Sequence, residues 1–187
     1  MRPLFTVHAG EFLVGQHIER SYPNLKVWIP SKDTGVDLLI TDLDRRSVSL
    51  QVKLSIDHVP LEAKDEFDRL LIAGGWLNLV HKKIENSPAD WWVIVLVSHE
   101  RIMKPQFIVI PPSELLSCLV KTLDKPSEKY NFYPQIMKRD SKPDLCLDGR
   151  GLSKKERENI TKDFQLGTRD LSKYLNNWSC LEALRKS

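Results

Sequence analysis

The stretch GVDLLITDLDRRSVSLQVKL, residues 35–54, decides the fold. It predicts a strand at 36–41, a turn through DLDRR and a second strand at 47–54. In the second strand apolar and polar residues alternate, so that one face is apolar and the other polar. If the two strands form a hairpin, an odd turn of three or five residues places Asp37 opposite Lys53 or Gln51 on the polar face. The register that buries the apolar residues therefore also gathers these three side chains.

The flanking sequence predicts the remaining elements of an α/β fold. Apolar residues at helical spacing predict the first helix, and the uniformly apolar run DWWVIVLVS predicts a central strand covered on both faces. The long helix after Pro60 is weakened by Gly74 and Gly75. The expected elements are helices at 8–20, 61–80 and 114–123 and strands at 25–29, 90–98 and 106–110.

The C-terminal third has weaker signals. Prolines and scattered charges at 123–150 favour an extended connector, and helical patterns return at 153–166 and 169–184. We therefore expect an α/β sandwich with a central mixed sheet flanked by helices. Residues 1–122 are expected to form the core, and residues 123–187 a connector and helical extension packed on or beside it.

Composition narrows the class of protein. The chain has 187 residues, of which 41% are hydrophobic, and a net charge of +3, which fits one compact domain. Its three cysteines lie far apart without CxxC spacing, which argues against a disulfide framework or zinc cluster and favours a reducing, cytoplasmic location. No run of about 18 apolar residues predicts a membrane span. Nucleotide-binding glycine motifs and histidine metal motifs are absent from the sequence.

The residues gathered by the hairpin suit phosphodiester hydrolysis. That reaction needs a hard cation held by oxygen ligands and a positive group near the developing negative charge. Asp37 is the expected main ligand, with the Gln51 side-chain oxygen and the Val52 carbonyl as further ligands. Lys53 is expected to orient the attacking water or stabilise charge, and Ser55 to add a hydrogen bond to the nucleic acid.

Glu11 is a fourth candidate for this site. On the first predicted helix it lies beside the apolar stripe that contains Val14 and Ile18. A carboxylate next to a buried stripe is costly unless it is paired. A direct or water-mediated contact with the metal would account for it, and an outward-pointing side chain at the edge of the stripe is the alternative.

Three segments together resemble a known superfamily. GEFLVGQHIE, GVDLLITD and SLQVKLS look like the helix, the Asp strand and the (D/E/Q)xK strand of the PD-(D/E)XK nucleases, over residues 8–112. By this resemblance Asp37 matches the metal-binding aspartate, Gln51 the variable ligand, Lys53 the catalytic lysine and Glu11 the helix-borne glutamate. Val36 replaces the usual proline. Gln51 replaces the usual carboxylate, although active QxK members exist.

The resemblance implies a restriction-endonuclease-like fold and a metal-dependent deoxyribonuclease, by the family's balance an endonuclease. Such an enzyme would use Mg²⁺, or Mn²⁺, and act in restriction, phage defence or DNA repair. Two alternatives stay open: a catalytically inactive DNA-binding or assembly subunit of a larger complex, and an RNA-processing nuclease. Besides DNA, the expected partners are a second copy of the chain, since cutting both strands commonly requires two sites, or another protein.

Basic residues are concentrated near the C-terminus. Residues 138–187 hold 12 basic and 8 acidic side chains. Lys154, Lys155 and Arg157 are expected to contact phosphates beyond the active centre. The tryptophans at 76, 91, 92 and 178 are expected to pack in the core rather than to stack on bases.

Overall fold

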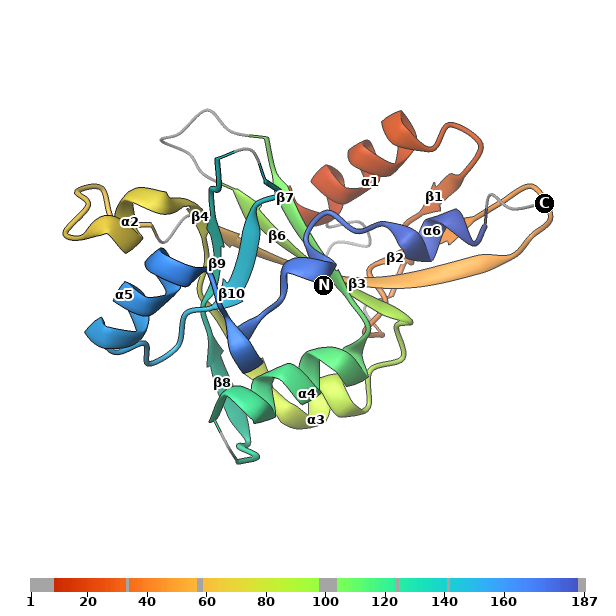
Figure 1. The fold of residues 1–187 in the computed structure, drawn as a ribbon. Helices are drawn as coiled ribbons and strands as arrows, with labels where there is room; N and C mark the ends of the chain where they lie inside the picture. Colours follow the sequence, from red (N-terminus) through yellow and green to blue (C-terminus); the bar gives the residue numbers. More distant parts are fainter. Residues whose placement is uncertain are drawn as a thin grey trace.

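The computed structural model describes residues 9–32, 34–56, 59–97, 104–123, 125–140 and 142–184. The chain forms a mixed α/β fold around a five-stranded sheet (Figure 1). The order in this sheet is β1-β2-β3-β6-β7, and only the β3/β6 pair is parallel. The five strands are β1 (Lys26–Trp28), β2 (Leu38–Thr41), β3 (Ser47–Ile56), β6 (Trp91–Val97) and β7 (Gln106–Ile110).

The predicted hairpin of β2 and β3 is confirmed. Thr41 pairs with Ser47 across a five-residue turn, and Leu38 pairs with Leu50. The turn is closed by Asp42, whose carboxylate accepts hydrogen bonds from the backbone N–H of Arg46 at 2.8 Å and from its Nε at 2.6 Å. Continuing this register by one residue brings Asp37 opposite Gln51, one of the two predicted arrangements.

Strand β6 is central, as its uniformly apolar sequence predicts. It lies between β3 and β7, and its alternate residues enter two different cores. Trp92 and Ile94 face one core, and Val93 and Val95 face the other. Both faces of the sheet are therefore covered.

Helix α1 (Ala9–Ser21) covers one face of the sheet. Its apolar stripe buries Val14 and Ile18 completely, as expected. The helix approaches β3 closely through Gly10, where a Cβ atom would lie only 3.0 Å from Leu54 Cβ and 3.3 Å from Val52 Cγ1. A larger residue at position 10 would push the first turn of α1 away from β3.

The other face is covered by helices α3 (His81–Glu85) and α4 (Pro112–Leu123) and by two small sheets. One sheet has the order β10-β9-β4, and the other pairs β5 with β8. Their strands are β4 (Leu71–Gly74), β5 (Leu77–Val80), β8 (Lys129–Phe132), β9 (Pro134–Met137) and β10 (Leu145–Asp148). Figure 1 shows α2 (Glu66–Leu70) and α5 (Lys154–Asp163) next to each other on one side of the β10-β9-β4 sheet.

The predicted long helix at 61–80 is wrong. Only α2 and the later α3 are helical in this region, and β4 and β5 lie between them. At the corner between the two strands, a Cβ on Gly75 would meet Leu96 at 2.7 Å and Ser55 at 2.8 Å. The glycine lets the chain turn against β3 and β6, and pairing with distant strands then outweighs the local helical preference.

The extended connector predicted at 123–150 is also wrong. Three strands form there, and β8 and β9 pair with β5 and β4. Tyr130, Phe132 and Ile136 are almost fully buried in the core beneath α4. Of the prolines in this segment, Pro134 is the first residue of β9, a position that a strand tolerates, and Pro126 and Pro143 lie outside the strands.

The C-terminal segment is partly as predicted. Helix α5 begins with a capping box in which Ser153 and Glu156 satisfy each other's backbone N–H groups. The helix predicted at 169–184 is instead a pair of 3₁₀ turns (Gly167–Arg169 and Ser172–Tyr174) followed by the short α6 (Ser179–Glu182). Trp178 and Leu181 of this C-terminal segment pack in the same core as Val14 and Ile18 of α1.

The tryptophan and cysteine side chains differ in how deeply they are buried. Trp92 and Trp178 are buried and Trp91 packs against the α1 core, as predicted, but Trp76 is 51% exposed. Cys146 and Cys180 are free thiols buried in the two cores, and burial raises the pKa of Cys180 to about 12. Within the described ranges, no helix is long and apolar enough to cross a lipid bilayer.

Candidate active site

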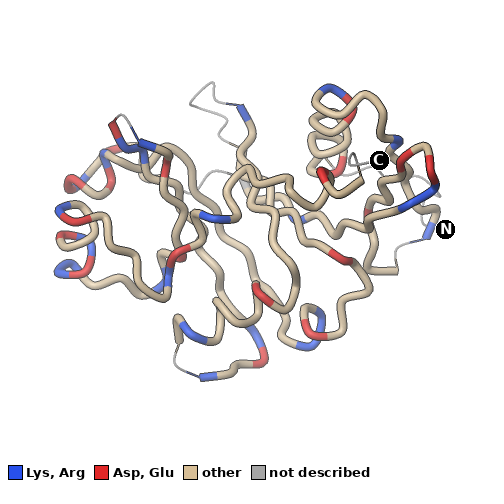
Figure 2. The backbone as a smooth tube through the Cα atoms, turned by 45° about the vertical axis from the view of Figure 1, so that its right-hand side comes forward, with Lys and Arg blue, Asp and Glu red and all other residues tan. Residues whose placement is uncertain are grey.

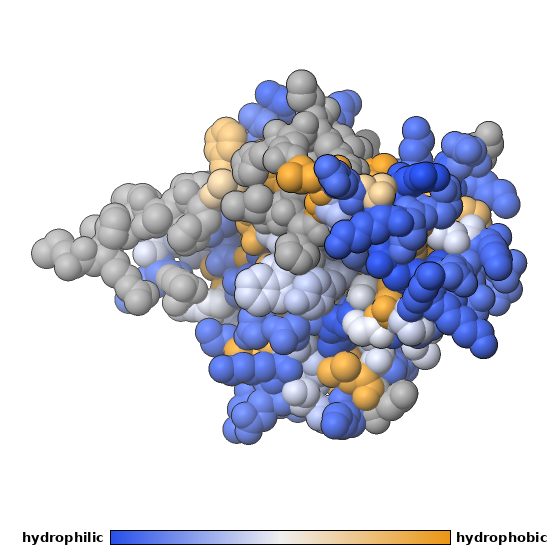
Figure 3. All heavy atoms as spheres, turned by 90° about the vertical axis from the view of Figure 1, so that its left-hand side faces the viewer, coloured by the Kyte–Doolittle hydropathy of each residue, from blue (hydrophilic) through white to orange (hydrophobic). Residues whose placement is uncertain are grey.

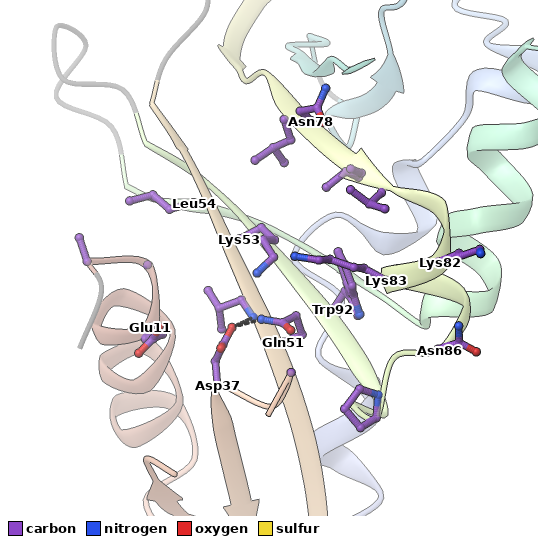
Figure 4. Close-up of a pocket in the computed structure, with 18 residues that line it drawn as sticks. Glu11, Asp37, Gln51, Lys53, Leu54, Asn78, Lys82, Lys83, Asn86 and Trp92 are labelled. Atoms are coloured by element: carbon purple, nitrogen blue, oxygen red, sulfur yellow. Dashed lines mark hydrogen bonds between the residues drawn. The ribbon is translucent and has the colours of Figure 1, made fainter. Parts of the chain in front are cut away.

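A cleft of about 830 Å³ opens beside the second half of β3. The β2 strand pairs with β3 only as far as Leu50. Beyond that residue, the edge of β3 that faces α1 has no neighbouring strand in the described sheet. One side of the cleft is formed by α1, Asp37 and β3, and the other by β5 and α3 (Figure 4). Its charged lining residues are Glu11, Asp37, Lys53, Lys82 and Lys83.

Asp37 is held at the start of β2 by its neighbours on β3. Its backbone N–H donates to the Leu50 carbonyl at 2.8 Å. Its Oδ2 accepts hydrogen bonds from the Val52 backbone N–H at 2.6 Å and from Gln51 Nε2. Both hydrogen bonds to the Asp37 carboxylate end on Oδ2. In the part of the chain that the structure describes, Oδ1 accepts no hydrogen bond. The fixed carboxylate thus presents one oxygen to the cleft.

Two further oxygens lie beside Asp37. Gln51 is 7% exposed, and rotation of its terminal amide would exchange the Nε2 donor for the Oε1 acceptor. The Val52 N–H points toward Asp37, and in an extended strand the carbonyl of the same residue points to the same side. The Val52 carbonyl therefore faces the open edge of β3, as a metal ligand would require.

Glu11 approaches the cleft from the first turn of α1. It is 8% exposed and lines the same cleft as Asp37. The close contact of Gly10 with β3 brings this turn to the edge of the sheet. The structure thus brings together Glu11, Asp37, Gln51 and Lys53, which the sequence predicts as one site (Figure 4).

Lys53 projects into the cleft from the same face of β3 as Gln51. Its Nζ lies 5.8 Å from the centroid of the Trp92 ring, a distance at which the π face attracts a cation. The indole is held in turn by Ser87, whose Oγ accepts from Trp92 Nε1 at 2.8 Å. Trp92 is therefore a candidate positioning residue for Lys53.

Sequence reasoning missed the β5–α3 side of the cleft. Lys82 and Lys83 line it, and in Figure 4 Lys83 extends toward Lys53 while Lys82 extends away from it. These lysines follow a segment that was predicted to be helical, so their position opposite Asp37 depends on the pairing of β5 with β8. The local sequence HKKIE carries no signal for it.

Ser55 has a structural partner. It lies two residues beyond Lys53 and is 6% exposed. Its hydroxyl accepts from the Trp76 backbone N–H at 2.8 Å and donates to the Trp76 carbonyl at 3.1 Å. These bonds hold the start of β5 against β3, and a role in binding nucleic acid stays a prediction.

The three basic residues predicted on α5 lie apart from the cleft, which no α5 residue lines. Arg157 pairs with Asp68 and lies 3.4 Å from Asp65, with its guanidinium 4.6 Å from the centroid of Phe67. Lys154 and Lys155 are exposed. The α2 and α5 region mixes basic and acidic positions (Figure 2), and the face that carries it is largely hydrophilic (Figure 3).

The oxygen donors of the cleft match the preferences of Mg²⁺. Asp37 Oδ1, the Gln51 amide oxygen, the Val52 carbonyl and Glu11 are all hard ligands. Among the described residues, no group of three or more His, Cys, Asp or Glu side chains is placed to hold a metal ion. A site here would therefore depend on the amide, the backbone carbonyl and water in addition to the two carboxylates.

Comparisons with protein-family models, curated proteins and solved structures gave no match to this chain.

Proposed function

We propose that this chain is a metal-dependent deoxyribonuclease with a restriction-endonuclease-like fold, which hydrolyses DNA phosphodiester bonds as an endonuclease. The observation that carries the proposal is that Glu11 of α1, Asp37 just before β2, and Gln51 and Lys53 of β3 all line one cleft. The central mixed sheet, with a β2/β3 hairpin and one parallel pair, supports the proposal because a mixed sheet flanked by helices is the α/β architecture that the sequence predicts.

The chemistry divides between the residues of the cleft. A bound Mg²⁺ or Mn²⁺ would neutralise charge on the phosphoryl oxygens and lower the pKa of the attacking water. Asp37, Gln51, the Val52 carbonyl and Glu11 would hold the cation. Lys53 would orient the water or stabilise negative charge as it develops.

The alternative is an inactive nuclease-fold subunit that binds DNA or assembles with a partner. One observation favours it: the neutral Gln51 donates its amide N–H to Asp37 instead of adding a carboxylate. An amide attracts a divalent cation less strongly than a carboxylate does. On this alternative, the cleft would bind DNA without cutting it.

Cleavage of supercoiled plasmid, linear duplex, branched DNA, single strands and RNA tests the proposal. We expect DNA cutting that needs Mg²⁺ or Mn²⁺, stops in EDTA and is lost in Asp37→Ala and Lys53→Ala. Asp44→Ala, a change in the hairpin turn outside the cleft, is the matched control. DNA binding without cutting on any substrate would support the inactive subunit, and cutting of RNA alone would support the RNA nuclease.

A further inference from the structure

Trp76 immediately precedes β5, the strand that lines one side of the cleft. Its backbone is bonded to Ser55, which shares a face of β3 with Lys53. The next four residues form β5, and all four line the cleft. The indole is 51% exposed, although its backbone is held in place on both the N–H and the carbonyl side. A large aromatic ring is thus presented to solvent from a fixed position.

Lys83 lies at the other end of the same wall. It follows β5 on α3, is exposed, and extends into the cleft toward Lys53 (Figure 4). The wall therefore has an exposed indole before β5 and a cation after it. Nucleic acid strands present the matching pair of groups, because each base offers a π face and each backbone linkage a phosphate.

The dimensions of the wall favour one strand over two. Four residues of β5 span about 13 Å at about 3.3 Å per residue, comparable to a few nucleotides of one strand at about 3.4 Å of rise each. The cleft volume of about 830 Å³ likewise accommodates a short piece of single strand.

We propose that the β5–α3 wall binds a single strand or an unpaired DNA end, with a base stacked on Trp76 and a phosphate bound by Lys83. This inference rests on the proposed function, because it takes the strand held there to be the substrate of the site. It names unpaired DNA as the substrate class and assigns roles to two residues, Trp76 and Lys83, to which the nuclease resemblance gives none.

Binding measured in EDTA tests the inference without cleavage. Fluorescence anisotropy would compare a labelled single strand, a duplex with a single-stranded overhang and a blunt duplex of equal length. We expect the single strand and the overhang to bind more tightly than the blunt duplex. Trp76→Ala should weaken single-strand binding by at least about fivefold, since stacking contributes on this scale, and Trp76→Phe should restore most of it.

Two matched controls accompany these variants. Trp28→Ala removes another indole, 57% exposed, on β1 at the edge of the sheet, and should leave the affinity unchanged. Lys83→Glu should weaken binding and lower the salt dependence, by a slope of about 0.7 for one lost phosphate contact. Lys121→Glu, an exposed lysine of α4 outside the cleft, should do neither.

Equal affinity for single strand and blunt duplex, or unchanged single-strand affinity in Trp76→Ala, would overturn the inference. The outcome is separable from that of the proposed function. If the expected binding pattern is found and no substrate is cut, the wall binds unpaired DNA and the hydrolase proposal fails. If duplex is cut by a metal-dependent site and Trp76→Ala changes nothing, the hydrolase proposal stands and this inference fails.

Discussion

The two sides of the cleft differ in how they are built. On the α1–β3 side, Asp37, Gln51 and Lys53 come from one hairpin and Glu11 from the preceding helix. On the β5–α3 side, Lys83 is placed by a strand that pairs with β8, about 50 residues further along the chain. The first side assembles from neighbours in sequence, and the second depends on distant pairing. On the proposed function, the first side performs the chemistry and the second positions the strand.

Lys53→Ala and Lys83→Glu should separate these roles most clearly. Loss of Lys53 should lower kcat by roughly 100-fold or more, as expected when a charge-stabilising group is removed. Lys83→Glu should mainly raise KM, because its phosphate contact is made equally in ground and transition states. Steady-state cleavage kinetics on one oligonucleotide measure both values. An equal loss of kcat in the two variants would contradict the division.

Gly75→Ala should damage the β5–α3 side through packing. A Cβ there would lie 2.7 Å from Leu96 Cδ2 and 2.8 Å from Ser55, and such overpacking costs about 1–3 kcal/mol of unfolding free energy. The control is Gly15→Ala in α1, where the nearest atom is 3.7 Å away and the change should be neutral or stabilising. Urea denaturation gives both values, and equal stability of the two variants would count against the corner described for Gly75.

Gln51→Glu should strengthen the α1–β3 side as a metal site. A second carboxylate beside Asp37 raises the ligand charge, which tunes divalent-cation affinity over decades. The metal concentration for half-maximal cleavage should fall on the order of tenfold. Gln165→Glu, at an exposed position outside the cleft, is the control. No change in metal dependence would mean that Gln51 is not a ligand.

Charge reversal at Lys154 and Lys155 should have a smaller effect than Lys83→Glu. Helix α5 carries four basic and three acidic side chains and contributes nothing to the cleft lining. We expect somewhat weaker DNA binding and a flatter salt dependence, measured by titration at several salt concentrations. A loss larger than that of Lys83→Glu would move the main phosphate contacts to α5.

The smallest expected effect is a pH dependence of the unfolding free energy through His17, a residue of α1. The His17 ring stacks on Trp178 and packs at a tilt against Phe107, both with ring centroids at 4.9 Å, and burial lowers its pKa. Because the unfolded chain then binds the proton more readily, stability should decrease as pH falls below about 6.5. Thermal unfolding at pH 7.5 and 5.5 should show a smaller decrease in His17→Phe than in the unchanged protein. If thermal stability fell equally in His17→Phe and in the unchanged protein, the pH dependence would come from other groups.

The sequence alone determined the α1–β3 side. Strict alternation in β3 leaves registers that bury Leu50 and Val52, and in each of them Asp37 shares a face with Gln51 and Lys53. The five-residue turn of the structure then selects the register in which Asp37 lies opposite Gln51. The apolar run of β6 similarly required a central strand. In β3 and β6, the apolar residues that the sequence pattern predicts to be buried pack in or against the two cores of the structure.

Only the tertiary structure decided the β5–α3 side and the exposure of Trp76. Residues 71–80 have a helical composition, but Gly75 fits against Ser55 and Leu96, and strands from 129–148 supply the hydrogen bonds of β4 and β5. Those partners lie far away in sequence, so no local pattern reports them. Long-range pairing and burial contribute more free energy than helix propensity, which differs by only about 1 kcal/mol per residue even for glycine.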